Sequence, residues 1–192
     1  MPQAYLEAIR NCRKPHDLSW KPPAFQVPGQ PQITAAELAA VGTNILDNAD
    51  FEEWGEGKDR PPDHWLSGLR ESAEVKNGSF SVKLVGSREG HVFVDQHLPA
   101  DAFAGKAILF GAWVKTATDT ETFLSIIDWV DSDHKLSHSR QHTGDGTWQF
   151  LVARKTIREK AGPLGIWFRL NANFDEAGDQ VYFDHAFAVV EE

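Results

Sequence analysis

The sequence predicts an all-β protein built from antiparallel strands, with a short proline-rich arm in front. From Thr43 onward, the chain of 192 residues breaks into short runs of alternating apolar and polar side chains. Turn-forming segments such as Asn77-Gly78 and Gly144-Asp145-Gly146 separate these runs. Many short strands at this spacing, with almost no helix between them, are typical of a sandwich or barrel. The predicted strands are 44–47, 64–68, 72–76, 79–85, 91–98, 106–116, 122–130, 135–141, 147–156, 164–172 and 180–190.

The composition excludes several classes of protein. Hydrophobic residues make up 41% of the sequence, which is enough for a core and excludes wholesale disorder. The net charge of −9 argues against a nucleic-acid partner, which needs clustered cations. No apolar run reaches the roughly 18–20 residues of a membrane span, so we expect no membrane insertion. Cys12 is the only cysteine, which excludes an intrachain disulfide and a cysteine zinc site.

Residues 1–42 form the predicted arm, and residues 43–192 form the domain. Six of the ten prolines fall within residues 1–33, so this stretch cannot be one regular element. Its apolar side chains are too many for an idle linker; they include Tyr5, Leu6, Ile9, Trp20 and Phe25. The arm either folds back on its own domain or docks on another subunit, which can be a second copy of this chain. We favour docking on other subunits of an assembly.

A short helix is predicted over residues 34–41, between the arm and the domain. Thr34-Ala-Ala-Glu37 fits a capping box, in which the Thr34 side chain accepts from the amide three residues on and Glu37 reaches back. Gly42 then ends the helix. This segment is predicted to act as a spacer.

Alternation assigns the side chains of two strands to opposite faces. In 164–172, the core face is Ile166, Phe168 and Leu170, and the opposite face is Trp167, Arg169 and Asn171. In 91–98, the core face is Val92, Val94 and Leu98, and the opposite face is His91, Phe93, Asp95 and His97.

Three further strands are assigned in the same way. In 122–130 we expect Phe123, Ile127 and Trp129 inside, because the other choice would bury Asp128 without an obvious partner. The remaining side chains assigned to the core are Trp148, Phe150 and Val152 in one strand, and Val181, Phe183, Phe187 and Val189 in the last.

Short motifs, taken in order along the domain, resemble carbohydrate-binding modules of the galactose-binding-like jelly-roll family. The opening Asn44-Ile-Leu-Asp-Asn48-Ala-Asp-Phe51-Glu52, followed by Pro62-Asp-His-Trp65, resembles the start of these modules. Further matching motifs are Gly78-Ser-Phe-Ser-Val-Lys-Leu84, Val94-Asp-Gln96, Ala112-Trp-Val-Lys115, Gly146-Thr-Trp148 and Val181-Tyr-Phe-Asp184. The resemblance covers residues 43–192 and implies an antiparallel jelly-roll β-sandwich.

The resemblance also implies a structural calcium ion where the first and last strands meet. The matching acids are Glu52 and Asp184, and backbone carbonyls around Lys76 to Ser79 would complete the oxygen ligands that calcium needs. The alternatives are that both acids are ordinary charges at strand ends, or that a lysine occupies the place of the ion. His185 stands where the family has a second closing acid.

Sugar recognition in this family uses one concave sheet, which maps here onto the polar faces described above. Aromatic rings suit the apolar side of a pyranose, and planar polar groups suit its hydroxyls. The implied carbohydrate-binding residues are Trp167, Arg169, Asn171, His91, Phe93, Asp95 and His97, with Asp128 nearby. The alternative is that the arm or a neighbouring subunit covers Trp167. Trp65 and Trp129 are assigned to the core.

Other chemistry has little support in the sequence. His134, His138 and His142 are spaced by four, but residues four apart on a strand lie about 13 Å apart, too far to share a metal ion. No common catalytic or nucleotide-binding motif occurs, so we do not expect an enzyme.

Two classes of function remain. The first is a carbohydrate-binding module accessory to polysaccharide degradation. The second is a non-enzymatic structural or adhesive subunit of a larger assembly, such as a phage decoration, fibre or tail component, whose jelly roll binds glycans. We favour the second, because it accounts for the apolar arm and for the lack of a signal peptide. The expected location is a virion or extracellular assembly; the alternative is the cytoplasm.

Overall fold

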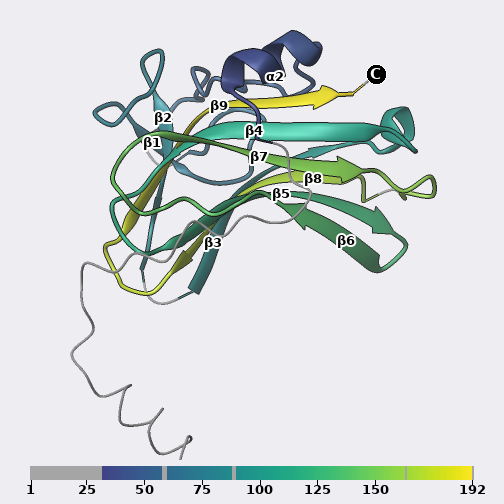
Figure 1. The fold of residues 1–192 in the computed structure, drawn as a ribbon. Coiled ribbons are helices and arrows are strands. Elements are labelled where there is room, and N and C mark those ends of the chain that lie inside the picture. The colour runs from purple at the N-terminus through teal and green to yellow at the C-terminus, as the bar shows by residue number, and fades with distance from the viewer. Residues whose placement is uncertain (1–31, 58–59, 88–89, 163, 192) are drawn as a thin grey trace, which may run out of the picture.

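The computed structural model describes residues 32–57, 60–87, 90–162 and 164–191. The arm side chains Tyr5, Leu6, Ile9, Trp20 and Phe25 lie outside this range. Within the range, two antiparallel sheets face one another and one short helix, α2 (Ala35–Val41), lies on the outside (Figure 1). No helix of the described part is long and apolar enough to cross a membrane. The predicted β-sandwich is confirmed.

The two sheets interleave strands that are distant in sequence. One sheet has five strands in the order β1-β2-β9-β4-β7, and the other has four in the order β3-β8-β5-β6. The strands of the larger sheet are β1 (Leu69–Glu71), β2 (Ser81–Val85), β4 (Ala107–Lys115), β7 (Gln149–Thr156) and β9 (Gln180–Val190). Those of the smaller sheet are β3 (Gly90–Leu98), β5 (Glu121–Val130), β6 (Asp133–His138) and β8 (Ile166–Phe174). A single 3-10 turn, η1 (Asp101–Phe103), follows β3 in the described chain.

The predicted strands 44–47, 64–68 and 72–76 are not strands, and β1 was not predicted. Hydrogen bonds from side chains replace a strand ladder in the first of these segments. The Asn44 amide donates to the carbonyl of Ala186 (3.0 Å) and its oxygen accepts from the amide of Ala188 (2.9 Å). The segment is therefore tied to β9 as a loop, a case in which side-chain bonding competes with regular structure.

The main core lies between the sheets and follows the predicted alternation in β8 and β3. Ile166, Phe168 and Leu170 are fully buried, and Val94 from β3 joins them. Phe168 meets Phe110 of the opposite sheet edge-on, with ring centroids 5.3 Å apart. The two-residue period thus places the intervening side chains of β3 and β8 on the outer face of the four-stranded sheet.

The predicted faces of β5 are wrong. Leu124 and Ile126 point into the core, and Phe123, Ile127 and Trp129 point outward. The prediction assumed that Asp128 would lack a partner on the core side. Asp128 instead accepts from the backbone amide and the Nε of Arg158 (2.9 and 3.0 Å). Lys155 Nζ lies a further 3.4 Å from the same carboxylate.

The predicted faces of β9 and β7 hold only in part. Val181 and Phe183 lie in the main core, but the register with β4 shifts between Gly111 and Trp113. This shift is a bulge at His185, whose φ of 48° is in the left-handed region. Beyond it the faces exchange. Phe187 and Val189 therefore join Phe150 and Val152 on the outer face of the five-stranded sheet.

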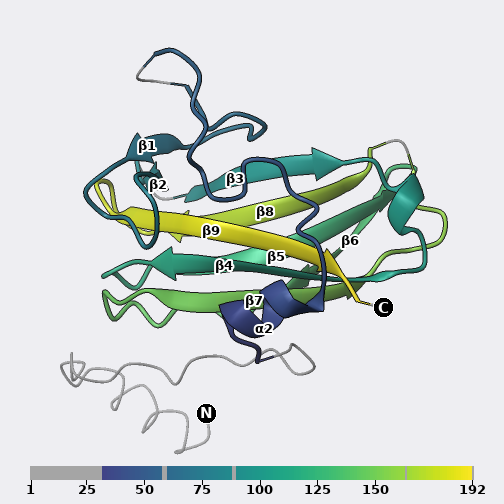
Figure 2. The ribbon, with the colours of Figure 1, turned by 90° about the horizontal axis from the view of Figure 1, so that it is seen from above.

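The helix α2 covers that outer face. Its predicted capping box is present: Thr34 Oγ1 accepts from the amide of Glu37 (3.2 Å), and Glu37 accepts from the amide of Thr34 (2.8 Å). Leu38 packs on Leu109, Val152 and Val189. A Cβ at Gly111 would come within 2.7 Å of Leu38, so glycine allows the helix its close approach. Figure 2 shows α2 lying against this sheet.

Candidate functional site

The candidate site is the outer face of the four-stranded sheet, the face that points away from α2 (Figure 1). Strand pairing aligns a polar row across all four strands: Asp95, Arg169, Ser125 and His138. A neighbouring row, one pair further along, contains Phe93, Asn171 and Phe123. The row on the other side contains His97, Trp167, Ile127 and Leu136.

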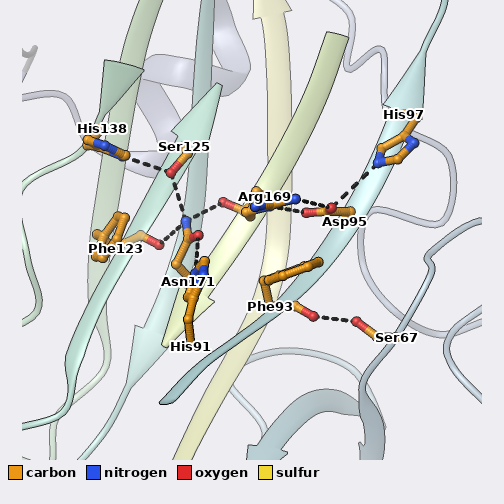
Figure 3. A network of polar contacts seen from close by, with 10 residues as sticks. All are labelled: Ser67, His91, Phe93, Asp95, His97, Phe123, Ser125, His138, Arg169 and Asn171. Carbon is orange, nitrogen blue, oxygen red and sulfur yellow. Dashed lines mark hydrogen bonds and ion pairs between the residues drawn. The ribbon is translucent and has the colours of Figure 1, made fainter. Parts of the chain in front are cut away.

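Arg169 and Asp95 form the centre of the polar row. Arg169 Nε and Nη2 each donate to one oxygen of Asp95, both at 2.8 Å, which makes the pair bidentate (Figure 3). The guanidinium also lies over the Phe93 ring, 3.7 Å from its centroid. Asp95 is only 2% exposed, and pairing offsets the cost of burying its charge. The pair is therefore a fixed part of the sheet surface.

Asn171 links the remaining polar side chains. Its Nδ2 donates to Ser125 Oγ (2.8 Å), and its Oδ1 lies 3.0 Å from His91 Nε2. Ser125 Oγ in turn lies 2.8 Å from His138 Nδ1 (Figure 3). Burial lowers the pKa of His138, so this ring favours its neutral form.

Aromatic rings cross the sheet beside the polar row. His97 stacks on Trp167 with centroids 4.3 Å apart and an angle of 9°. The ring centroid of Trp129 lies 4.9 Å from that of Trp167 and 4.7 Å from that of His134. Because β3 and β5 flank β8, His97 and Trp129 lie on opposite sides of the Trp167 indole. The indole Nε1 also donates to the carbonyl of Leu164 (2.8 Å), so Trp167 is held as the middle ring in a row of three, stacked on His97 and tilted by 47° against Trp129.

Apolar side chains remain open to solvent on and around this face. Phe93 is 37% exposed and Leu136 is 44% exposed. Leu66 and Leu164, also exposed, lie in loops beside β3 and β8; the amide of Leu66 donates to the carbonyl of Asp95 (2.9 Å). Ser67 Oγ donates to the carbonyl of Phe93 in the same region (Figure 3). The face thus combines hydrogen-bonded polar side chains with exposed apolar surface. The exception is Trp129 Nε1, which is buried and has no hydrogen-bond partner among the described residues.

The structure brings seven of the eight predicted carbohydrate-binding residues onto this face, namely Trp167, Arg169, Asn171, His91, Phe93, Asp95 and His97. The predicted placement of Asp128 near this face is wrong. It pairs with Ile166 on the core side of the sheet, is fully buried, and is held by Arg158. Trp65 is in the core as expected, but Trp129 is not.

Sequence reasoning missed Phe123, Ser125 and Trp129 on β5 and His138 on β6. The signal that could have found them is the alternation in β5, read with its polar side chain Ser125 outward. With Ser125 outward, Asp128 points inward and needs a partner there. That partner is Arg158, which lies 30 residues further along the chain.

The predicted calcium ligands are held by one segment of backbone. Glu52 Oε1 accepts from the amides of Ser79 and Phe80 (2.8 and 3.0 Å). Asp184 Oδ2 accepts from the amides of Lys76 and Asn77 (2.7 and 3.0 Å). Amide donors therefore face these carboxylates, where the prediction named carbonyl oxygens.

One carboxylate oxygen at this place makes no hydrogen bond. Asp184 Oδ1 is buried and has no hydrogen-bond partner among the described residues, but His185 Nδ1 lies 3.8 Å from it and the Asp184 carboxylate raises the pKa of His185. The described part of the chain has no group of three or more His, Cys, Asp or Glu side chains placed to hold a metal ion. Glu52 and Asp184 would have to bind calcium together with backbone oxygens, and this site stays a prediction.

No protein-family model and no curated protein matches the chain. Several solved structures match, and several of these are carbohydrate-binding modules. One is TmCBM61 in complex with β-1,4-galactotriose, with 18% identity and a TM-score of 0.53 over 78% of this chain and 100% of that one.

Two other matches have different roles. Tailspike protein 4 of bacteriophage CBA120 matches with 16% identity and a TM-score of 0.54, over 77% of this chain and 21% of that one. A cyclase from Fischerella sp. TAU matches with 12% identity and a TM-score of 0.56, over 79% of this chain and 100% of that one. At these identities the likeness concerns the fold, which serves more than one function. The chain has the jelly-roll sandwich fold of carbohydrate-binding modules.

Proposed function

We propose that the outer face of the four-stranded sheet binds a glycan, and that the protein is a non-enzymatic binding subunit. The observation that carries this proposal is the polar row of Asp95, Arg169, Ser125 and His138, fixed between two rows of aromatic and aliphatic side chains. Binding sites of this kind combine apolar surface with a few placed polar groups. The similarity to several carbohydrate-binding modules supports the same reading.

A glycan array followed by titration calorimetry tests the proposal. The first soluble probes are β-1,4-galactotriose and xylohexaose, each of which is the ligand in one of the similar solved structures. Phe93→Ala and Trp167→Ala should each weaken binding at least about tenfold, because each removes aromatic surface from the face. The control is Leu69→Ala, which removes an exposed side chain of β1 in the other sheet and should leave binding unchanged. Equal affinities in all of these proteins would refute the proposed site.

We further propose that the binding domain belongs to a larger extracellular or virion assembly, anchored by its N-terminal arm. The similarity to part of a phage tailspike supports this, as do the apolar side chains of the arm. The chain enters the described domain at α2, on the sheet opposite the candidate site. An anchor on that side would leave the binding face free. Calcium at Glu52 and Asp184 would be structural in this scheme.

Deletion of residues 1–31 tests the anchoring role and retains Ile33 and Thr34, which pack and cap α2. The truncated chain should keep its thermal unfolding midpoint and its glycan affinity. It should no longer co-purify with other subunits when tagged full-length and truncated chains are expressed in the source cells. Equal recovery of partners with both chains would refute the anchor.

A further inference from the structure

We propose that a directional chain of hydrogen bonds, from His91 through Asn171 and Ser125 to His138, fixes which ring nitrogen of each histidine faces a bound sugar. This inference rests on the proposed glycan-binding function and specifies the polarity of that site. The chain crosses all four strands, from β3 through β8 and β5 to β6.

The orientation of the Asn171 amide sets the direction at the first link. Its Nδ2 lies 3.1 Å from the carbonyl of Phe123 and 3.2 Å from the carbonyl of Arg169. Carbonyls only accept, so the nitrogen and not the oxygen of the amide must face them. Asn171 Oδ1 then faces His91, and His91 Nε2 must carry a proton to donate across the 3.0 Å contact.

Ser125 accepts a hydrogen bond from Asn171 and donates one to His138. Its Oγ accepts from Asn171 Nδ2 at 2.8 Å, which leaves its own hydroxyl proton to donate to His138 Nδ1 at 2.8 Å. His138 Nδ1 is thus an acceptor, and the proton of the neutral ring sits on Nε2. The lowered pKa of this half-buried ring agrees with a neutral acceptor.

Burial makes the chain hard to reverse. Asn171 is 2% exposed and Ser125 is 1% exposed. Turning the amide or the hydroxyl would leave buried polar atoms without a hydrogen-bond partner, which is unfavourable. The direction of the chain is therefore built into the sheet before any ligand arrives.

The two ends of the chain offer opposite chemistry to a ligand. His91, with its Nε2 proton used inside the chain, leaves Nδ1 as an acceptor. His138, with Nδ1 used inside the chain, leaves Nε2–H as a donor. A sugar that lies across the strands would need a hydroxyl donor over β3 and an acceptor oxygen over β6. The polarity of the chain thereby selects among the orientations of one glycan.

Ring nitrogen NMR of the free protein tests the chain without a ligand. At a pH where both rings are neutral, the wild type should show one tautomer for each of the two histidines, with the proton on Nε2. Ser125→Ala should raise the pKa of His138 and allow both of its tautomers, and leave His91 unchanged. Asn171→Asp should change both rings. The control is Asn173→Ala on the same face of β8, which removes an amide that contacts Glu121, adds no charge beside His91 and should change neither ring.

The affinity for β-1,4-galactotriose and xylohexaose then tests whether the hydrogen-bond chain contributes to glycan binding. Ser125→Ala should weaken binding at least about tenfold although Ser125 is not exposed, and Asn173→Ala should not. An Nδ1–H tautomer at either histidine, or an unchanged His138 in Ser125→Ala, would overturn the chain. Wild-type protein that binds no glycan would overturn the ligand preference and the proposed function, while the spectra would still decide the chain.

Discussion

The two outer faces of the sandwich differ in what lies on them. On the five-stranded sheet, Leu109, Val152 and Val189 form an apolar surface that Leu38 of α2 covers. On the four-stranded sheet, the middle of the outer face holds the Arg169–Asp95 pair and the Asn171 network, and Phe93 and Leu136 stay exposed. An apolar face with its own cover has a structural role, whereas a rigid polar face with exposed rings around it suits a ligand.

The difference has a physical basis in how each face is made rigid. Dispersion and apolar burial hold α2 in place, and these forces need a close-fitting partner. The open face is instead fixed by hydrogen bonds within the sheet, so it keeps its shape without a partner. Such preorganisation lowers the entropy cost of ordering side chains when a ligand binds.

The largest expected effect comes from truncating one leucine on each face. Leu38→Ala should lower the free energy of unfolding by about 2–5 kcal/mol, because it leaves a cavity under α2. Leu136→Ala removes a side chain that is 44% exposed and should change the free energy of unfolding by less than about 0.5 kcal/mol. Urea denaturation of both variants measures the difference. Equal stabilities would show that α2 does not stabilise the face that it covers.

The side-chain faces of two strands of the four-stranded sheet could be predicted from the sequence. In β8, large apolar side chains alternate with Trp167, Arg169 and Asn171 without interruption, so the two-residue period was enough to assign both faces. In β3 the alternation has one exception on the core side: Gln96 is buried there and bonds to the backbone of Asp47 (2.9 Å to both its amide and its carbonyl). These two strands carry all seven predicted site residues that lie on the open face.

The errors occurred where a distant residue changes the local pattern. In β5, apolar side chains occupy both faces, and the position of Asp128 depends on Arg158 and Lys155, which no short window contains. In β9, the bulge at His185 exchanges the faces halfway along the strand. Alternation alone also cannot tell a main core from a second core, which is why Phe150 and Val152 were assigned to the wrong layer.

A smaller effect concerns one ion pair on each sheet. The open face has the Arg169–Asp95 pair at its centre, whereas the five-stranded sheet has Lys83–Glu71 at its β1–β2 edge, with Nζ and Oε2 2.6 Å apart. The hydrogen bond from Lys83, followed by one from the amide of Ala73, lowers the pKa of Glu71 to about 2. A carboxyl with a depressed pKa stabilises the fold above its unfolded value of 4.5, and this stability is lost as the pH falls toward 2.

Lys83→Met should therefore raise the pKa of Glu71 while leaving it below 4.5, because the amides of Ser72 and Ala73 still donate to Oε1 (both 2.8 Å). Carboxyl carbon NMR across pH 1.5 to 6 measures this shift; the stability at neutral pH should fall by less than about 1 kcal/mol, as for other pairs near a surface. Lys115→Met, which removes the neighbouring pair with Glu74, is the matched control and should leave Glu71 unchanged. A Glu71 titration that is identical in the wild type and in Lys83→Met would mean that backbone amides alone lower the pKa of Glu71, and that the Lys83–Glu71 pair does not contribute to this edge of the sheet.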